Sequence, residues 1–233
     1  MIFIITATVN VFLDVHPDHS SSISRRNEYI QNLISLNTSL SRSNLSTYKI
    51  FFIENSSDLV CNLNLYPHLS NVEYVNFDRN LNFSRGKGYC EIQMINHVLD
   101  SFDSSSFFVK VTGRYFIANW HYIFKKLPLR NHSPNLLGTE EINVISKQFS
   151  SRFFLASFSC WRSKFAQAML SKVDDNIGYF IEHALYDLSC FYKPVILDVL
   201  PSRTATSATT SNRLRLNPFM RLFKKIIYLF VKP

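Results

Sequence analysis

The chain has 233 residues, an apolar and aromatic content typical of a folded globular protein, and a formal net charge of +8 at pH 7. This length is enough to bury a substantial core, which excludes a disordered chain and favours one main domain. The charge implies an anionic partner: nucleic acid, an acidic membrane surface and a diphosphate-bearing substrate all fit it.

The N-terminal part of the chain predicts a βαβ unit. The apolar run from Ile2 to Thr8 is typical of a parallel strand covered on both faces. No basic residue precedes it and Asp14 follows, so we do not expect a signal peptide. An amphipathic helix is expected from Arg25 to Leu40, where apolar residues recur at helical spacing. A strand from Lys49 to Ile53 follows, and strand, helix and strand in this order predict a right-handed crossover in a parallel sheet.

The next elements extend this sheet. We expect a third strand over Val72 to Phe77, a loop over Asn82 to Gly88, and a helix from about Tyr89 to Asp100. Another apolar strand, FFVKVTGRYFI, covers Phe107 to Ile117. This order predicts an open, mostly parallel α/β sheet of the Rossmann-like kind flanked by helices, in which ligands bind at the carboxyl ends of the strands.

The second half is less regular. Residues 151–170 predict a strand followed by a helix, and residues 174–192 predict a helix entered through Asp174 or Asp175 as N-cap. PVILDVLP, residues 194–201, is expected to be the last strand. The four cysteines are far apart and have no CxxC pair, so neither a disulfide framework nor a zinc site is expected, and a reducing compartment fits best.

The C-terminal segment differs from the rest. We expect a main domain over residues 1–200, a mobile Ser/Thr/Ala-rich linker over 201–216 and a basic amphipathic helix over 217–233. Its apolar run covers about 16 residues, fewer than the roughly 20 that cross a bilayer core. We therefore expect residues 217–232 to lie on an anionic membrane surface. The alternative is a terminal helix docked on the protein's own core.

Glycine is scarce, so the segment SRGKG is conspicuous. Gly86 and Gly88 free the backbone, Arg85 and Lys87 carry positive charge, and the following helix would present its N-terminus. These are the groups that a diphosphate requires. A solvated loop is the alternative, because such a turn alone has little specificity.

The order of these motifs resembles that of the GT-A glycosyltransferases. The likeness covers about the first 120 residues: a strand ending near TATVN, a strand ending in ENSSD, and N-x-SRGKG opening a helix. The resemblance implies a nucleotide-sugar donor. It implies donor-binding roles for Thr6, Ala7, Asn10, Glu54, Asn55, Asn82, Arg85, Gly86, Lys87, Gly88, Thr112, Gly113 and Tyr115.

One motif departs from that family. Where the family carries Asp-x-Asp to hold a divalent cation, this chain reads KVTGRY, with Lys110 and Arg114. The K-x-TGRY motif is similar to that of bacterial polysaccharide glycosyltransferases, and the two cations could stabilise the leaving diphosphate. We therefore expect neither a metal site nor a cofactor. The alternatives are ordinary strand charges at these positions, or a carboxylate pair elsewhere that binds a cation.

An inverting transfer requires a general base beside the acceptor hydroxyl. The resemblance places it on a later helix, where GYFIEHALYDL offers Glu182 first and His183 second, with Asp174 and Asp175 in reserve. The aromatic group around Trp161 could stack on an acceptor sugar, or it could be core.

Three classes of function follow. The first is a cytoplasmic glycosyltransferase at the inner face of the membrane, which uses a glycan or lipid-linked acceptor in cell-surface polysaccharide synthesis. The second is a nucleic-acid-binding protein, which is not favoured because the basic residues are spread along the chain and no binding motif occurs. The third is a catalytically inactive relative of the first class that acts as an interaction subunit.

Overall fold

A computed structural model describes residues 1–7, 19–43, 45, 47–55, 67–77, 83–102, 107–113, 115–117, 119–126, 135–192, 194–197 and 199. The expected linker and C-terminal helix, residues 201–233, lie outside these ranges. The elements are β1 (Ile2–Ala7), α1 (His19–Ser41), β2 (Lys49–Glu54), β3 (Val72–Asn76), η1 (Phe83–Arg85), α3 (Lys87–Leu99), β4 (Phe107–Thr112), α4 (Trp120–Lys126), β5 (Leu137–Thr139), β6 (Ile142–Asn143), β7 (Gln148–Phe149), β8 (Phe153–Ser157), α5 (Phe158–Trp161), α6 (Lys164–Leu170), η2 (Asp175–Ile177), α7 (Ile181–Phe191) and β9 (Val195–Ile196).

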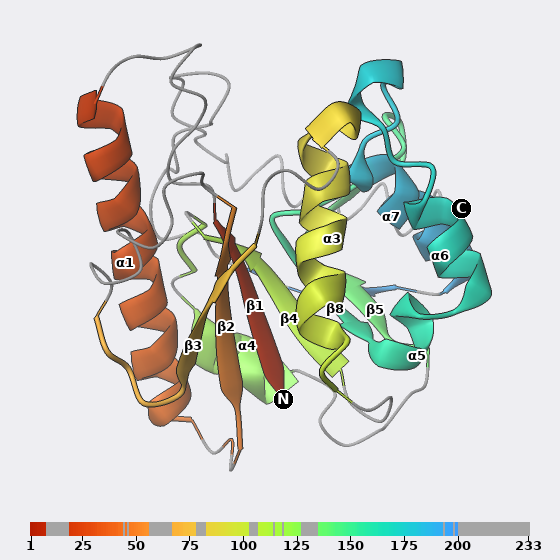
Figure 1. Cartoon of the computed structure of the whole chain (residues 1–233). Helices are drawn as coiled ribbons and strands as arrows, with labels where there is room; N and C mark the ends of the chain where they lie inside the picture. Colours follow the sequence, from red (N-terminus) through yellow and green to blue (C-terminus); the bar gives the residue numbers. More distant parts are fainter. Residues whose placement is uncertain are drawn as a thin grey trace.

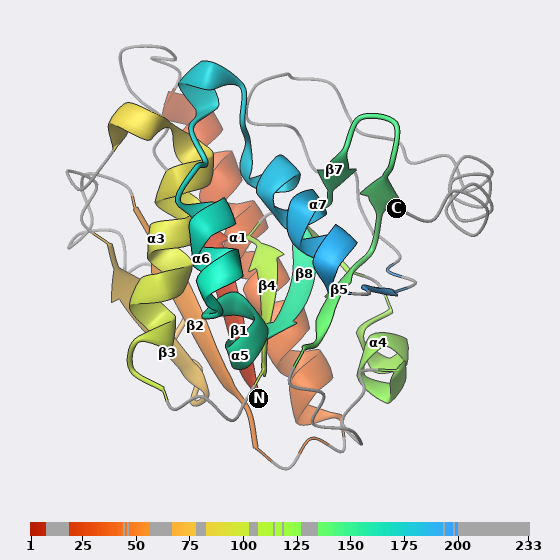
Figure 2. The same ribbon diagram turned by 90° about the vertical axis from the view of Figure 1, so that its right-hand side faces the viewer.

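A seven-stranded sheet in the order β3-β2-β1-β4-β8-β5-β9 forms the centre of the molecule (Figure 1). The first four strands of this order are parallel, and β8 runs antiparallel to both of its neighbours, β4 and β5. The predicted mostly parallel α/β sheet with flanking helices is confirmed. The small β6–β7 hairpin, which the sequence did not predict, lies beside α7 (Figure 2).

Alternating side chains of the central strands pack into two separate hydrophobic cores, one on each face of the sheet. Phe3 and Ile5 of β1 pack with α1 and α4 on one face, whereas Ile2 and Ile4 pack with α3, α5, α6 and α7 on the other. Since both faces of each strand are covered, the strands are continuously apolar, as the sequence suggested. None of the helices in the described ranges is long and apolar enough to span a bilayer.

The aromatic group around Trp161 belongs to the core. Trp161 is 1% exposed, stacks on Phe154 with a centroid distance of 5.7 Å, and donates a hydrogen bond from Nε1 to Asn96 Oδ1 at 2.8 Å. Phe158 is fully buried, and the Arg162 guanidinium donates to the carbonyls of Leu99 and Phe102 at the C-terminal end of α3. Of the two interpretations that the sequence left open, sugar platform or core, the burial of Phe158 and Trp161 supports core.

The helix expected over 174–192 is two elements. The Asp174 side chain accepts from Asn176 N at 2.9 Å and caps the short helix η2, which Gly178 ends in a left-handed conformation at φ 75°. Helix α7 begins only at Ile181, after Phe180 as N-cap. Asp174 is thus an N-cap, but of the turn before the expected helix.

Two cysteines provide a test of this packing. Burial raises the pKa of the Cys160 thiol to about 12, and Cys160 is 1% exposed, whereas Cys190 is exposed at the end of α7. Because the thiolate is the reactive form, N-ethylmaleimide at about pH 8 is expected to modify Cys190 well before Cys160. Site-resolved mass spectrometry measures the two rates. Equal rates in the folded protein, rather than only in denaturant, would contradict the packing of α5.

Candidate functional site

The carboxyl ends of β1, β2 and β4 meet at one edge of the sheet. Gly113 N donates to the Thr6 carbonyl at 2.9 Å, and Asn55 N donates to the Ala7 carbonyl at 3.3 Å. Glu54 is fully buried at the end of β2. The structure therefore brings most of the expected donor-binding residues of these strands to one edge. Asn10, Asn82 and Arg114 lie outside the described residues.

Lys110 is the buried cation of this edge. Its side chain is completely inaccessible, and its ammonium lies 2.6 Å from Glu91 Oε1 on α3. It also donates to Thr112 Oγ1 at 2.9 Å and to the Ser151 carbonyl at 2.5 Å. Thr6 Oγ1 donates to the same Glu91 oxygen at 2.7 Å. The three N–H donors of an ammonium therefore all have protein acceptors.

This arrangement changes the expected role of Lys110. An ammonium whose three donors already bind protein oxygens has none left for a diphosphate in this conformation. Lys110 instead ties β4 to α3 through Glu91 and to the segment before β8 through Ser151. The expectation that Lys110 binds the diphosphate directly does not match this geometry. In this conformation Lys110 positions its neighbours.

The same cluster disfavours a divalent cation at the end of β4. In the KVTGRY segment, where the resemblance led us to look for metal-binding acids, Lys110 is bonded to Thr112, and the nearby carboxylate, Glu91, is paired with the ammonium. No group of three or more His, Cys, Asp or Glu side chains that could hold a metal ion gathers within the described ranges. Among the described residues, the end of β4 therefore offers an ammonium and a hydroxyl, with the one nearby carboxylate already paired, where a divalent cation would need free oxygen ligands.

Glu182 lies across the sheet edge from Lys110 and is linked to it. It occupies the first turn of α7, and its Oε1 accepts a hydrogen bond from Ser151 Oγ at 2.5 Å. The carbonyl of the same serine accepts from Lys110. Ser151 thus joins the buried cation to the carboxylate. Among the described residues, no cation lies within ion-pair distance of Glu182.

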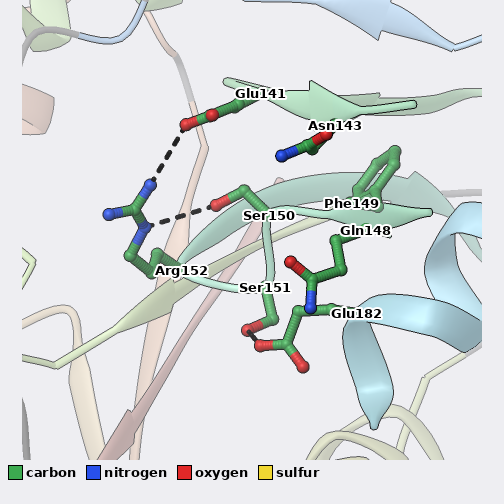
Figure 3. Close-up of a pocket in the computed structure, with 8 residues that line it drawn as sticks. All are labelled: Glu141, Asn143, Gln148, Phe149, Ser150, Ser151, Arg152 and Glu182. Atoms are coloured by element: carbon green, nitrogen blue, oxygen red, sulfur yellow. Dashed lines mark hydrogen bonds and ion pairs between the residues drawn. The ribbon is translucent and has the colours of Figure 1, made fainter. Parts of the chain in front are cut away.

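A polar cavity of about 270 Å³ opens beside Glu182 (Figure 3). Because Thr112 N bonds to the Arg152 carbonyl at 2.8 Å, the cavity adjoins the carboxyl end of β4. A carboxylate, hydrogen-bonding amides and hydroxyls at this edge of an α/β sheet suit a polar ligand. Its lining consists of Glu141, Asn143, Gln148, Phe149, Ser150, Ser151, Arg152 and Glu182.

Two neighbouring carboxylates hold Arg152, which lines this cavity together with one of them, Glu141. Arg152 lies 3.3 Å from Glu140 Oε1 and 3.5 Å from Glu141 Oε2, and its guanidinium faces the Tyr115 ring at 5.4 Å. The Tyr115 hydroxyl donates a hydrogen bond to the other oxygen of Glu140, Oε2. Tyr115 therefore supports the cavity wall from behind, through Glu140. The sequence analysis did not identify Glu140, Glu141, Ser151 or Arg152.

His183, the second candidate base, has a structural role. Its Nδ1 accepts from the backbone N–H of Phe180 at 3.2 Å, and its ring stacks on the Phe180 ring at 5.5 Å. It thereby satisfies the backbone N–H of Phe180, the N-cap residue of α7, and it is not among the residues that line the cavity. Of the two candidates, the geometry favours Glu182.

The SRGKG segment already binds an anion of the protein itself. Asp175 Oδ2 accepts from Lys87 N at 2.7 Å and from Gly88 N at 3.3 Å, at the N-terminus of α3. Arg85 donates to the Ser171 carbonyl at 2.5 Å and lies 3.9 Å from Asp174. A carboxylate from the η2 turn thus occupies the amides that the sequence assigned to a diphosphate.

The glycines of this segment make room for that carboxylate. Gly86 has φ +91°, and a Cβ on it would lie 2.4 Å from Asp175 Cβ. At Gly113 a Cβ would lie 2.3 Å from the Tyr29 ring of α1. Packing against Asp175 and Tyr29 therefore accounts for Gly86 and Gly113 without a ligand.

Substituting Gly86 with alanine is expected to destabilise the protein strongly. The backbone there is nearly restricted to glycine, at a cost of about 1–3 kcal/mol for other residues, and the clash with Asp175 adds to it. Gly178→Ala is the matched control, since its φ is +75° but nothing lies within 4 Å of the added Cβ. Urea unfolding compares them. Equal losses of unfolding free energy would contradict the contact with Asp175.

Comparisons with known proteins identify the fold. No family model matches the sequence, and no curated protein is significantly similar to it. The galactosyltransferase LgtC, solved with donor and acceptor sugar analogs, superposes with a TM-score of 0.52 at 9% identity, covering 81% of this chain and 70% of that one. The bifunctional glycosyltransferase WbbM gives 0.51 at 13% identity, over 84% of this chain and 38% of that one.

A third solved structure is the mannosyltransferase PcManGT from Pyrobaculum calidifontis, in complex with GDP-Man and Mn²⁺. It gives a TM-score of 0.50 at 10% identity, over 89% of this chain and 57% of that one. This chain therefore spans little more than half of PcManGT and little more than a third of WbbM. At these identities the similarity shows the fold, which is of the GT-A type that the resemblance predicted.

Proposed function

We propose that the protein is a nucleotide-sugar-dependent glycosyltransferase. The observation that carries the proposal is a carboxylate, Glu182, beside a polar cavity at the carboxyl edge of a GT-A-type sheet. In open α/β sheets this edge is where ligands bind. The similar structures were solved with donor or acceptor sugar analogs in LgtC and with GDP-Man in PcManGT, which supports the same ligand class here.

In the proposed reaction Glu182 is the general base. Its carboxylate takes the proton of an acceptor hydroxyl, and that oxygen forms a bond to the anomeric carbon of the donor sugar. The bond between the anomeric carbon and the diphosphate oxygen breaks, and the nucleoside diphosphate leaves with the electron pair. Attack opposite to the leaving group inverts the anomeric centre. Ser151 orients the base through the 2.5 Å hydrogen bond to Oε1.

We further propose that this transfer proceeds without a divalent cation. Support comes from the end of β4, where Lys110 pairs with Glu91 in place of a metal-binding acid pair. Because Lys110 is occupied by protein acceptors, Arg114 is the cation of the motif that we assign to the leaving diphosphate. Arg85 and Lys87, at the N-terminus of α3, are further donor-binding candidates. Thr6, Glu54 and Thr112 are assigned to the donor side of the sheet edge.

The acceptor and the location complete the proposal. We assign a glycan or lipid-linked acceptor of cell-surface polysaccharide synthesis, reached at the cytoplasmic face of the membrane. The support is the basic amphipathic pattern of residues 217–232, in which Arg221, Lys224 and Lys225 lie off the apolar face.

A thermal-shift panel of nucleoside diphosphates and sugar nucleotides tests the donor assignment. A ligand at 100 times its dissociation constant stabilises the folded state by about 2.7 kcal/mol, which such an assay detects easily. We expect one sugar nucleotide of the panel, with a particular base and a particular sugar, to raise the melting temperature most. The rise should be equal with and without Mg²⁺ or Mn²⁺. The free nucleoside is the control. A panel in which no sugar nucleotide raises the melting temperature would contradict the proposal.

A further inference from the structure

The cavity beside Glu182 has the size of a single ring. Its volume of about 270 Å³ is below the roughly 300–1,000 Å³ of pockets that take drug-sized ligands. A complete sugar nucleotide, with base, ribose and diphosphate, exceeds it. One sugar ring, from the donor or from the acceptor, is the part of the substrates that fits.

The charges around the cavity are unfavourable for an anion. Among the described residues that line it, Arg152 is the one cation, and it is paired with Glu140 and Glu141 at 3.3 and 3.5 Å. Two carboxylates, Glu141 and Glu182, line the same space. Within the described ranges, the Glu182 carboxylate accepts a hydrogen bond from the neutral hydroxyl of Ser151. An acidic ligand would place a further negative charge beside this carboxylate.

The hydrogen-bonding groups of the cavity suit hydroxyls. Asn143 Oδ1 accepts from Ile145 N and Ser146 N, both at 3.1 Å, which turns the amide nitrogen away from the hairpin backbone. Gln148 Oε1 accepts from Ser146 Oγ at 3.2 Å, which leaves its amide nitrogen as the donor end, and Gln148 lines the same cavity as Glu182 (Figure 3). Amide donors beside a carboxylate acceptor match neighbouring hydroxyls, each of which donates and accepts.

We infer that this cavity binds an uncharged, hydroxyl-rich sugar ring and rejects acidic sugars. Gln148 and Asn143 donate to ring hydroxyls, Glu182 accepts from one, and the paired state of Arg152 removes the cation that a carboxylated sugar would need. This inference rests on the proposed glycosyltransferase function. It adds a substrate class to it: a neutral sugar rather than a uronic or sialic acid.

Saturation-transfer difference NMR on the full chain, saturated with the nucleoside diphosphate that stabilises it, tests the inference. Methyl glucoside and methyl galactoside are the neutral probes, and methyl glucuronide is the acidic one. We expect at least one neutral glycoside to bind about tenfold or more tightly than the glucuronide, because like charges brought together weaken binding. A glucuronide that binds as well as both neutral glycosides would overturn the inference.

Two variants locate the effect. Gln148→Ala is expected to weaken the neutral glycoside by about three- to tenfold, since one neutral hydrogen bond is lost. Glu182→Gln is expected to reduce the difference in affinity between the glucoside and the glucuronide, because the carboxylate that repels the acidic sugar is gone. Gln31→Ala, at an exposed position of α1, is the control. It should change neither the affinity for the neutral glycoside nor the difference in affinity between glucoside and glucuronide. A Glu182→Gln variant with the same ratio of glucoside to glucuronide affinity as the unsubstituted protein would also overturn the inference.

The same experiment shows whether the bound ring belongs to the donor or to the acceptor. It also distinguishes failure of this inference from failure of the proposed function. Displacement of the glycoside by the sugar nucleotide, but not by its nucleoside diphosphate, identifies the donor sugar as occupant. Simultaneous binding with the sugar nucleotide identifies the acceptor, and both results support a neutral-sugar cavity. If nucleotides bind but no neutral glycoside does, only this inference fails. If no nucleotide binds, the proposed function fails with it.

Discussion

Glu182→Gln is expected to lower turnover by about 10²- to 10⁴-fold, the contribution typical of a general base. Glutamine keeps the shape of the side chain and can still accept the hydrogen bond from Ser151, but its amide cannot take a proton from the acceptor. Donor affinity should therefore change little. Release of the nucleoside diphosphate measures turnover, and calorimetry with the donor measures affinity.

A remote carboxylate provides the control for this substitution. Glu73 pairs with Lys49 at 2.5 Å on the surface, and both side chains are 49% exposed. Glu73→Gln should leave turnover unchanged, because an exposed ion pair contributes little. A Glu182→Gln enzyme that turns over at the rate of the Glu73→Gln control would remove Glu182 as the base.

Lys110→Met is expected to cause the largest loss of stability among substitutions at the sheet edge. Methionine fills the space, but it leaves Glu91 without its cation. Breaking a buried ion pair in this way costs about 3–5 kcal/mol. The lower end applies here, because the Glu91 side chain is 20% exposed. Urea unfolding measures the change in unfolding free energy.

The double variant Lys110→Met with Glu91→Gln separates the charge from the packing. It removes the stranded carboxylate, so we expect it to recover much of the lost stability, since neutral replacements of buried pairs are often tolerated. The Thr6 hydroxyl can still donate to the amide oxygen of the substituted side chain. A double variant as unstable as Lys110→Met would show that Glu91 is not the partner that matters.

The sheet was predictable because its central strands are long and apolar on both faces. β1 is buried throughout and β4 along its four central residues, and a continuous apolar run of this kind has few alternatives to a covered parallel strand. β5, β6 and β7 were missed, because two- and three-residue strands have too few side chains to show a period. The antiparallel direction of β8 depends on contacts with β4 and β5, which sequence order does not reveal.

The candidate site was predictable in part. The sequence singled out Lys110 as a cation in an apolar strand, but it did not identify Glu91 as its partner. The pair joins a strand to a helix residue 19 positions earlier, which faces Lys110 only in the fold. The available signal was the position of Glu91 one turn after the start of α3 at Lys87. Asp175 was missed as the partner of the SRGKG amides for the same reason, since 87 residues separate it from Gly88.

Detection of nucleoside diphosphate released from the stabilising sugar nucleotide, in the presence of a chelator and a neutral acceptor glycoside, tests the central claim most directly. The proposed mechanism predicts that release continues in the chelator and falls by about 10²-fold or more in Glu182→Gln. The absence of release from any sugar nucleotide that binds would contradict a glycosyltransferase. Release that stops in the chelator and returns with Mn²⁺ would contradict transfer without a metal.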